Sequence, residues 1–396
     1  MKRARYLLIP VILMALIIPT VNSAVEKVSQ DNLASKDITA IGHEYNNKIR
    51  DKGGVLKDAM SEKGDLMILG SSELNSDVEQ NPVNLFPFEG AEYDVSILGR
   101  AYFQSLQHTA LLNSIKTADS DSKIAIVVSL QWFFNNDGIE ASDYAANFSE
   151  YQFYKIFNDK NISHENKLYY AKRNNELLRG QNEYREEQIY SQLYIQDNLL
   201  SNTALTILKP YYKFKEYLLE MKDKTHTTNL LKQQKDNTES EVVKDIDWDK
   251  AYAEAEKQGM AAATNNPLNV EDSYYDTYLR DRYDSLENSL GDVDLLASKE
   301  LEDYEYFLKI AKDKGVKPLI ILMPVNGDYY DHLGITEDER IAYYDKLEAL
   351  GNEYGFDVLN LKDRDYEKYY LMDVMHLGWK GWLNVNEEIS QYYNEK

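Results

Sequence analysis

The stretch Met67-Ile68-Leu69-Gly70-Ser71-Ser72-Glu73-Leu74 is an apolar run that ends in Gly-Ser-Ser. Four other parts of the chain contain short apolar runs closed by turn-forming or polar residues: Tyr93–Leu98, Ile124–Leu130, Pro318–Met323 and Phe356–Leu361. Runs this short, rich in Val, Ile and Leu and without polar alternation, are typical of parallel strands that are buried on both faces. The five runs therefore predict the strands of one sheet.

Helical patterns lie between and after these runs. Four segments carry apolar residues at helical spacing: 101–116, 301–314, 341–354 and 379–393. Gly315 and Gly355 follow two of these segments directly, where a glycine commonly caps the C-terminus of a helix. Strands that alternate with helices predict an α/β fold with an open, mainly parallel five-stranded sheet and flanking helices.

The region from about 144 to 290 contains no strand-like run. Residues 168–235 favour long helices, with an interruption expected at Pro210 because a proline inside a helix removes a backbone hydrogen bond. Residues 248–259 form a further helical pattern. We therefore expect a helical insertion at about 144–290, between the third and fourth strands. It would serve as a cap over an active site, as a docking surface for a partner, or only as a solvated subdomain.

The composition excludes several classes of function. The chain has 396 residues, of which 67 are acidic and 44 basic, so its formal net charge is −23. This charge argues against nucleic acid as a partner, because phosphate binding needs a basic face. The chain has no cysteine, which excludes a cysteine nucleophile, a disulfide and a thiolate metal ligand. The histidines are scattered and no phosphate-binding glycine loop occurs, so we expect neither a metal nor a cofactor.

The N-terminus bears on the cellular compartment. Lys2, Arg3 and Arg5 precede an uncharged apolar stretch. One interpretation is a cleaved signal peptide, although the small-residue cleavage site is a poor match. The other is a retained membrane anchor with its positive side inside, because the stretch approaches the roughly 17–25 residues that span a bilayer. We expect the anchor, over 1–25, with residues 26–396 as an extracytoplasmic α/β domain.

Residues suited to chemistry follow the predicted strands. In chain order they are Ser71 and Ser72, Gly99 and Arg100, Gln131 and Trp132, Asn326, and Asp373 and His376. Sites in open α/β sheets form at the carboxyl ends of the strands, so these residues are expected at one edge. A serine in such a loop acts as a nucleophile when a histidine takes its proton and a carboxylate orients the histidine. The pattern predicts a serine–histidine–aspartate site.

Each of these residues also has a structural explanation. Ser72 fits the N-cap of a helix, because serine commonly accepts hydrogen bonds from the first free N–H groups. His376 fits a histidine bound to a backbone carbonyl, and Asp373 fits a cap of the last helix. Trp132 fits a packing role, and Arg100 fits an ion pair as well as it fits an anionic substrate. The local motifs alone do not separate these alternatives.

The motifs together resemble a known family. Gly70-Ser71-Ser72 occupies the position of the Gly-Asp-Ser block of the SGNH, or GDSL-like, hydrolase superfamily, and Asp373-x-x-His376 resembles that superfamily's Asp and His block. The full set resembles the DltD family more closely: Gly70–Leu74, Gly99-Arg100 followed by 104–108, Ser129–Phe133, 324–327 and 373–376. That family comprises membrane-anchored, extracytoplasmic proteins of Gram-positive bacteria that are required to D-alanylate teichoic acids.

The resemblance implies a role for each site residue. Ser72 matches the nucleophile, His376 the general base and Asp373 its orienting carboxylate. The backbone N–H groups of Ser72 and Gly99 would face a developing oxyanion. The generic superfamily has a Gly-x-Asn-Asp-like block after the third strand, whereas this chain has Gln131, as the DltD family does. Gln131 is therefore expected to supply the side-chain donor of the oxyanion hole.

The resemblance also implies an activity and its partners. It predicts acyl transfer from a D-alanyl donor, a carrier protein or a membrane acyltransferase of the same pathway, to a teichoic acid, with Arg100, Trp132 and Asn326 as substrate contacts. An esterase or thioesterase with the same triad is one alternative. A non-catalytic scaffold that docks the carrier or the acyltransferase is another. The net charge of −23 suits the ammonium of a D-alanyl group but repels a polyphosphate acceptor.

Overall fold

The sheet of the protein has the predicted strands. The computed structural model describes residues 2–237 and 245–394, with side chains from residue 17 onward. Five parallel strands are paired in the order β2-β1-β3-β4-β5. Their bounds are β1 (Leu66–Gly70), β2 (Val95–Gly99), β3 (Ile124–Val128), β4 (Leu319–Leu322) and β5 (Val358–Asn360). The prediction of an α/β fold with an open, parallel five-stranded sheet is confirmed.

Helices cover both faces of this sheet. Successive strand residues point to opposite faces, so Leu69 packs into one apolar core and Ile68 into another. The first core contains side chains of three helices: α6 (Ser105–Asn113), α14 (Glu300–Lys314) and α16 (Glu337–Tyr354). The second contains Trp382 of α17 (Trp379–Asn394). Burial on both faces explains why the strands lack polar alternation.

The predicted flanking helices are present with adjusted ends. Gly315 and Gly355 follow α14 and α16 with φ of 76° and 83°, the left-handed conformation expected of a C-terminal glycine. Six further helices of the described chain lie before the insertion or after β4, and all but the first are short: α1 (Lys2–Ser35), α2 (Thr39–His43), α3 (Lys48–Lys52), α4 (Val55–Lys63), α5 (Pro82–Leu85) and α15 (Gly327–Leu333).

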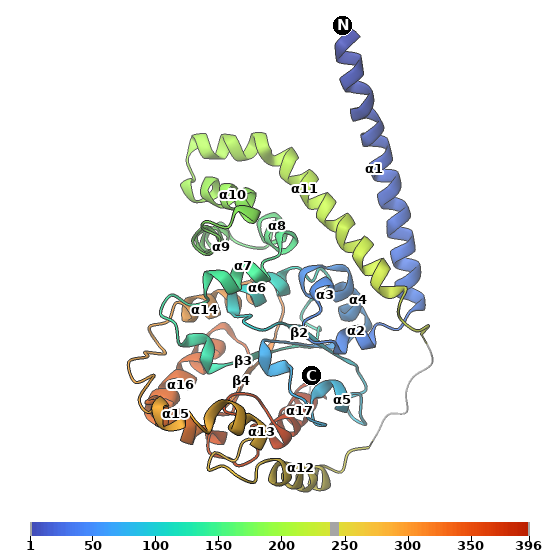
Figure 1. Cartoon of the computed structure of the whole chain (residues 1–396). Coiled ribbons are helices and arrows are strands. Elements are labelled where there is room, and N and C mark those ends of the chain that lie inside the picture. The colour runs from blue at the N-terminus through green and yellow to red at the C-terminus, as the bar shows by residue number, and fades with distance from the viewer. Residues whose placement is uncertain (1, 238–244, 395–396) are drawn as a thin grey trace.

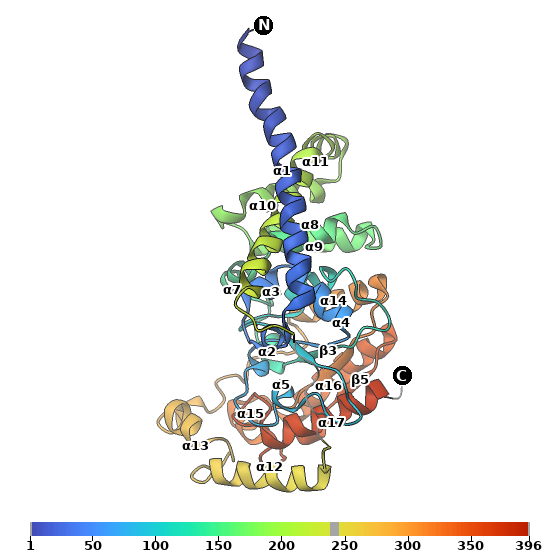
Figure 2. The same cartoon turned by 90° about the vertical axis from the view of Figure 1, so that its right-hand side faces the viewer.

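The region predicted as one helical insertion lies on two sides of the sheet. Its helices are α7 (Ala141–Asn147), α8 (Glu150–Asn158), α9 (His164–Leu177), α10 (Arg185–Gln196), α11 (Leu199–Leu231), α12 (Trp248–Ala262) and α13 (Asp272–Tyr274). Helices α7 to α11 share an apolar core with Leu106 of α6 and Tyr306 of α14. Ala255 of α12 instead belongs to the core beneath α17. Figures 1 and 2 show α12 at the opposite end of the molecule from α9 to α11.

The expected interruption at Pro210 was wrong. Helix α11 continues through Pro210, and Figure 1 shows that this helix bends along its course, as helices with an internal proline do. The chain turns earlier, where Asp197 adopts a φ of 37° and the Asn198 side chain accepts a hydrogen bond from the N–H of Ser201. The buried ring of Tyr212 holds the helix beyond the proline against the insertion core.

The N-terminal segment forms the first part of α1, which extends away from the sheet (Figure 1). The predicted anchor over 1–25 begins at Met1, which lies outside the described residues. In the part of the chain that the structure describes, no helix combines the length and apolar character needed to cross a membrane. The membrane-spanning part of the prediction is therefore unsupported.

Candidate active site

Three side chains from the two ends of the chain meet at the edge of the sheet. Ser72 begins a short 3-10 turn (Ser72–Leu74) just after β1. Its Oγ lies 3.0 Å from Nε2 of His376. The Nδ1 of His376 lies 2.6 Å from Oδ2 of Asp373. With Asp373 ionised, Nδ1 carries the proton and Nε2 is free to accept the Ser72 hydroxyl proton.

The loop before α17 fixes this arrangement locally. Oδ1 of Asp373 accepts hydrogen bonds from the backbone N–H groups of Met375 and His376, both at 2.8 Å. Asp373 thus closes a turn around its own histidine partner and does not cap α17, which begins six residues later at Trp379. One carboxylate oxygen orders the loop, and the other orients the imidazole.

The ends of β1 and β2 approach each other closely beside Ser72. Gly70 pairs with Gly99, and a Cβ added to Gly99 would lie 1.7 Å from the carbonyl oxygen of Gly70. Gly99 also has a φ of 156°, which side chains rarely adopt, so only glycine fits. The Ser71 hydroxyl donates to the carbonyl oxygen of Arg100 at 3.2 Å and does not cap the 3-10 turn. The loops after β1 and β2 are therefore joined.

Two neighbouring acids raise the pKa of the His376 imidazole. Burial by itself lowers the pKa of His376, but the hydrogen bond and charge of Asp373, together with the charge of Glu73, outweigh burial and raise that pKa. A raised pKa stabilises the imidazolium that forms when the histidine accepts a proton. His376 is thereby suited to proton transfer.

Glu73 is a site residue that the sequence interpretation missed. Its side chain is 2% exposed, and burial raises the pKa of its carboxyl to about 7. One carboxyl oxygen has no hydrogen-bond partner among the described residues. A buried acid directly after Ser72 exerts its charge on His376. In the sequence, Glu73 could have been noticed as the one charged residue of the stretch from Met67 to Leu74.

Gln131 lies in the loop after β3, held by two hydrogen bonds. Its Nε2 donates to the hydroxyl of Tyr330 at 2.9 Å, and the Ser129 hydroxyl donates to its Oε1. Tyr330 is fully buried in the core beneath this edge, and the sequence interpretation did not single it out. The two bonds fix the Gln131 amide without reaching Ser72, so its oxyanion role stays a prediction, as do the roles of the Ser72 and Gly99 N–H groups.

Two of the three expected substrate contacts are engaged within the protein. Trp132 is 5% exposed and stacks on the buried ring of His108, with 5.5 Å between centroids. Asn326 caps α15, because its Oδ1 accepts from the N–H of Tyr329 at 3.0 Å. These contacts account for both residues by packing and capping. Arg100 differs, as its Nε donates to Asn46 at 2.7 Å while Nη1 is buried without a partner among the described residues.

The segment 268–286 lies beside the Asp373 loop. Leu268 and Val270 pack against Val374 in a small apolar cluster, and the N–H of Glu271 donates to the carbonyl of Met372 at 2.7 Å. The Nδ2 of Asn326 donates to the Leu268 carbonyl at 2.9 Å. This short stretch of the insertion, and not the long helices α9 to α11, therefore contacts the candidate site.

The fold and the site define a class of protein. It is a parallel α/β protein in which a serine, a histidine and an aspartate form one hydrogen-bonded chain at the carboxyl ends of the strands. In the described residues, no group of three or more histidine or acidic side chains is placed to hold a metal ion. The family model described as DltD protein matches residues 42–394, so the chain belongs to the DltD family.

Curated relatives agree with this assignment. The chain is 30% identical over 329 residues to Protein DltD of Bacillus subtilis (strain 168), covering 83% of this chain and 82% of the relative. It is 27% identical over 348 residues to Protein DltD of Staphylococcus aureus (strain NCTC 8325 / PS 47), covering 86% and 84%. Protein DltD of Lacticaseibacillus rhamnosus is 22% identical over 347 residues, covering 86% and 80%. The family match over residues 42–394 includes all five strands and the insertion.

Proposed function

We propose that this protein acts outside the cytoplasm in the D-alanylation of teichoic acid, as a serine acyltransferase whose nucleophile is Ser72. Membership of the DltD family supports the pathway. The hydrogen bond between Ser72 and His376, which lie 304 residues apart in the sequence, supports the enzymatic mechanism. The SGNH-like relationship and an N-terminal membrane anchor are part of the same proposal.

The proposed reaction has two halves. The Ser72 Oγ attacks a D-alanyl ester or thioester carbonyl while Nε2 of His376 takes the hydroxyl proton, and Asp373 stabilises the imidazolium. Backbone N–H groups of Ser72 and Gly99, with the Gln131 amide, would hold the oxyanion. The leaving alcohol or thiol takes the proton from His376, and a D-alanyl ester remains on Ser72. A hydroxyl of the teichoic acid then gives its proton to His376, attacks this ester and releases the Ser72 hydroxyl.

Hydrolysis shares the first half of this reaction. If water replaces the acceptor hydroxyl, the same residues make an esterase or thioesterase, so the distinction lies in acceptor binding and water exclusion. A scaffold that docks a carrier protein or a membrane acyltransferase needs none of the three side chains. The hydrolase therefore differs from the proposal in its product, which is free D-alanine. The scaffold differs from it in not requiring Ser72.

Complementation of a strain that lacks the gene tests the proposal. We expect Ser72→Ala to leave the D-alanine ester content of the teichoic acid at the level of the deletion strain, with normal protein abundance. The matched control Ser71→Ala removes the neighbouring hydroxyl and should retain most of the content. Normal D-alanylation by Ser72→Ala would contradict the proposal and favour the scaffold. Release of free D-alanine by the purified protein, without ester on added polymer, would favour the hydrolase.

A further inference from the structure

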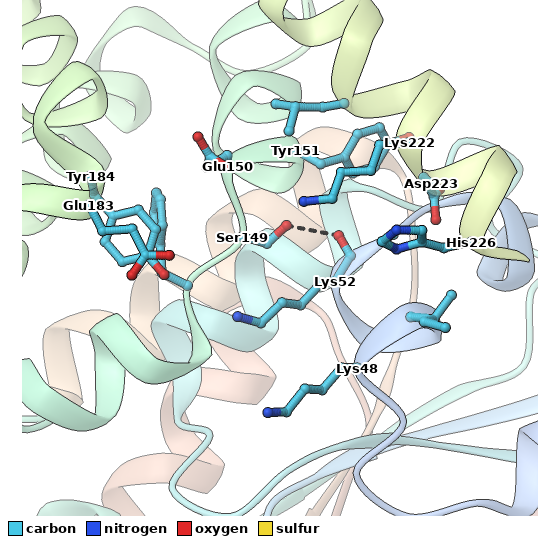
Figure 3. A pocket seen from close by; sticks show the side chains of 14 residues that line it. Lys48, Lys52, Ser149, Glu150, Tyr151, Glu183, Tyr184, Lys222, Asp223 and His226 are labelled. Atoms are coloured by element: carbon cyan, nitrogen blue, oxygen red, sulfur yellow. Dashed lines mark hydrogen bonds between the residues drawn. The ribbon is translucent and has the colours of Figure 1, made fainter. Parts of the chain in front are cut away.

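A cavity of about 290 Å³ lies between the sheet domain and helices of the insertion (Figure 3). Its volume is at the lower end of the roughly 300–1,000 Å³ that is usual for small-ligand sites. Lys48 and Lys52 of α3 and Lys222 of α11 line it, together with His226. In Figure 3 the three lysine side chains point the same way, towards the space that Glu183 bounds on the far side.

These three lysines lack the acidic partners that lysines elsewhere in the neighbouring helices have. Lys155 pairs with Glu220, and Lys215 pairs with Glu187 at 2.7 Å. Within residues 2–237 and 245–394, by contrast, no carboxylate lies within ion-pair distance of Lys48, Lys52 or Lys222. In a chain with 67 acidic residues, three unpaired ammonium groups in one cavity indicate a site that an external anion would complete.

The carboxylates of the cavity are mostly engaged elsewhere. Asp223 accepts hydrogen bonds from the backbone N–H groups of Gly54 and Val55 at 2.7 and 3.0 Å. Glu150 pairs with Lys215 at 2.8 Å. Glu183 and Asp223 are therefore the two acids lining the cavity for which the described residues offer no ion pair. The three lysines outnumber these two carboxylates, so the cavity has a small local excess of positive charge in an acidic chain.

The electrostatics of Lys52 agree with this geometry. Burial, followed by the charges of Arg100 and Lys48, lowers the pKa of the Lys52 ammonium to about 8, and Glu183 opposes this effect only in part. Its Nζ donates to the backbone carbonyl of Ala146 at 3.2 Å. An anion among these groups would relieve the mutual repulsion of the cations.

A short path of hydrogen bonds joins the α3 end of the cavity to the loop of Ser71 and Ser72. Asn46, two residues before Lys48, accepts a hydrogen bond from Nε of Arg100 at 2.7 Å. The carbonyl of Arg100 in turn accepts the Ser71 hydroxyl at 3.2 Å. Arg100 thus links the loop before the α3 lysines to the nucleophile loop, and its charge acts on Lys52. A chain molecule bound in the cavity by one anion would reach the Ser72 loop along this path.

We propose that this lysine cavity binds phosphodiester groups of the polyanionic acceptor, whose chain continues past Arg100 and presents a hydroxyl at Ser72. The proposal rests on the proposed function for its acceptor. Ammonium groups bind phosphate as charged hydrogen-bond donors. A local basic surface also explains how a protein of net charge −23 approaches a polyphosphate.

Binding of a soluble poly(glycerol phosphate) fragment to the full chain tests the proposal. The variant is Lys48→Glu/Lys222→Glu, in a Ser72→Ala background so that no turnover occurs. We expect the Kd to rise about tenfold or more, because charge-assisted hydrogen bonds are replaced by repulsion. The control Lys250→Glu/Lys257→Glu makes the same charge change on exposed residues of α12, and should alter the Kd by about twofold or less. Equal Kd values for the two variants would overturn the proposal.

Two further arms keep the outcome unambiguous. Lys48→Gln/Lys222→Gln removes the charges without reversing them and should also weaken binding, while circular dichroism verifies the fold. Phosphatidylglycerol vesicles carry the same phosphodiester on a membrane surface. If the lysine variants lose vesicle binding but keep polymer binding, the cavity is a lipid-headgroup site and the proposal is wrong. Because binding is measured without turnover, a failure of the Ser72 mechanism leaves this result unchanged, and unaltered binding leaves the Ser72 mechanism standing.

Discussion

The hydroxyl oxygen of Ser72 lies 3.0 Å from Nε2 of His376, although 304 residues separate them in the sequence. The contact depends on the core, because Ile68 of β1 and Trp382 of α17 belong to the same apolar cluster beneath the sheet. The strand that carries the serine and the helix that follows the histidine are therefore packed together. The geometry of the site is a property of the whole fold.

Asp373→Asn tests how the histidine is oriented. An asparagine can present its N–H₂ to Nδ1 of His376, which then favours the tautomer whose proton is on Nε2, where it cannot accept the Ser72 proton. We expect kcat/KM for a D-alanyl ester to fall by roughly a thousandfold or more, as for the aspartate of serine protease triads. Asp328→Asn, an exposed change in α15, is the control. A rate within the range of that control would show that Asp373 does not act through His376.

Glu73→Gln tests the electrostatic role of the buried acid. The negative charge of Glu73 contributes to the raised pKa of His376, so its removal lowers that pKa. The acidic limb of the profile of kcat/KM against pH should move to lower pH, because the neutral imidazole then persists to lower pH. The exposed Glu79→Gln leaves the profile unchanged. An acidic limb that stays in place, or moves to higher pH, contradicts this role.

The same Glu73→Gln change should alter stability in a pH-dependent way. Burial raises the pKa of the Glu73 carboxyl from 4.5 to about 7, so the folded state favours its protonated form. The contribution of this carboxyl to the free energy of unfolding is present in full below its unfolded pKa of 4.5. It is lost as the pH rises through the folded pKa of about 7. At pH 8 we expect Glu73→Gln to be more stable than the parent by about 3 kcal/mol, with little difference at pH 4. Urea unfolding at the two pH values measures this, and a variant less stable at pH 8 contradicts it.

Trp132→Ala separates packing from substrate contact. Trp132 is almost fully buried against His108, so its loss leaves a cavity in the core, and the free energy of unfolding should fall by roughly 3–5 kcal/mol. The milder Trp132→Phe should keep KM for the acyl donor near that of the parent. A raised KM with unchanged stability in Trp132→Phe would instead support the substrate contact that the sequence predicts.

The strands could be predicted because most of their residues are apolar without alternation, as Leu66 to Leu69 illustrates, and burial on both faces favours that pattern. The spacing of Asp373 and His376 was also readable, since a three-residue separation places both on one turn. Helix ends were less secure. The break between α10 and α11 lies at Asp197, where Asn198 and Ser201 form the capping box that begins α11, whereas Pro210 lies inside α11 without ending it.

Other features needed the folded structure. Burial gives Glu73 its raised pKa, and burial depends on neighbours that are distant in sequence. Trp132 and Asn326 follow strands as site residues do, yet packing and capping occupy them. The sequence also gave no sign that Leu268, and not the longer helices, would contact the Asp373 loop. Local pattern identifies the edge of the sheet, whereas the tertiary contacts decide which side chains at that edge are free to act.

Covalent labelling of the full-length protein with a fluorophosphonate tests the central claim most directly. Such probes modify a serine whose hydroxyl is activated by a neighbouring base. The account predicts that peptide mass mapping finds the label on Ser72, that His376→Ala abolishes labelling, and that Ser71→Ala retains it. Absence of label from Ser72 in the folded parent protein, or equal labelling in His376→Ala, would contradict the account.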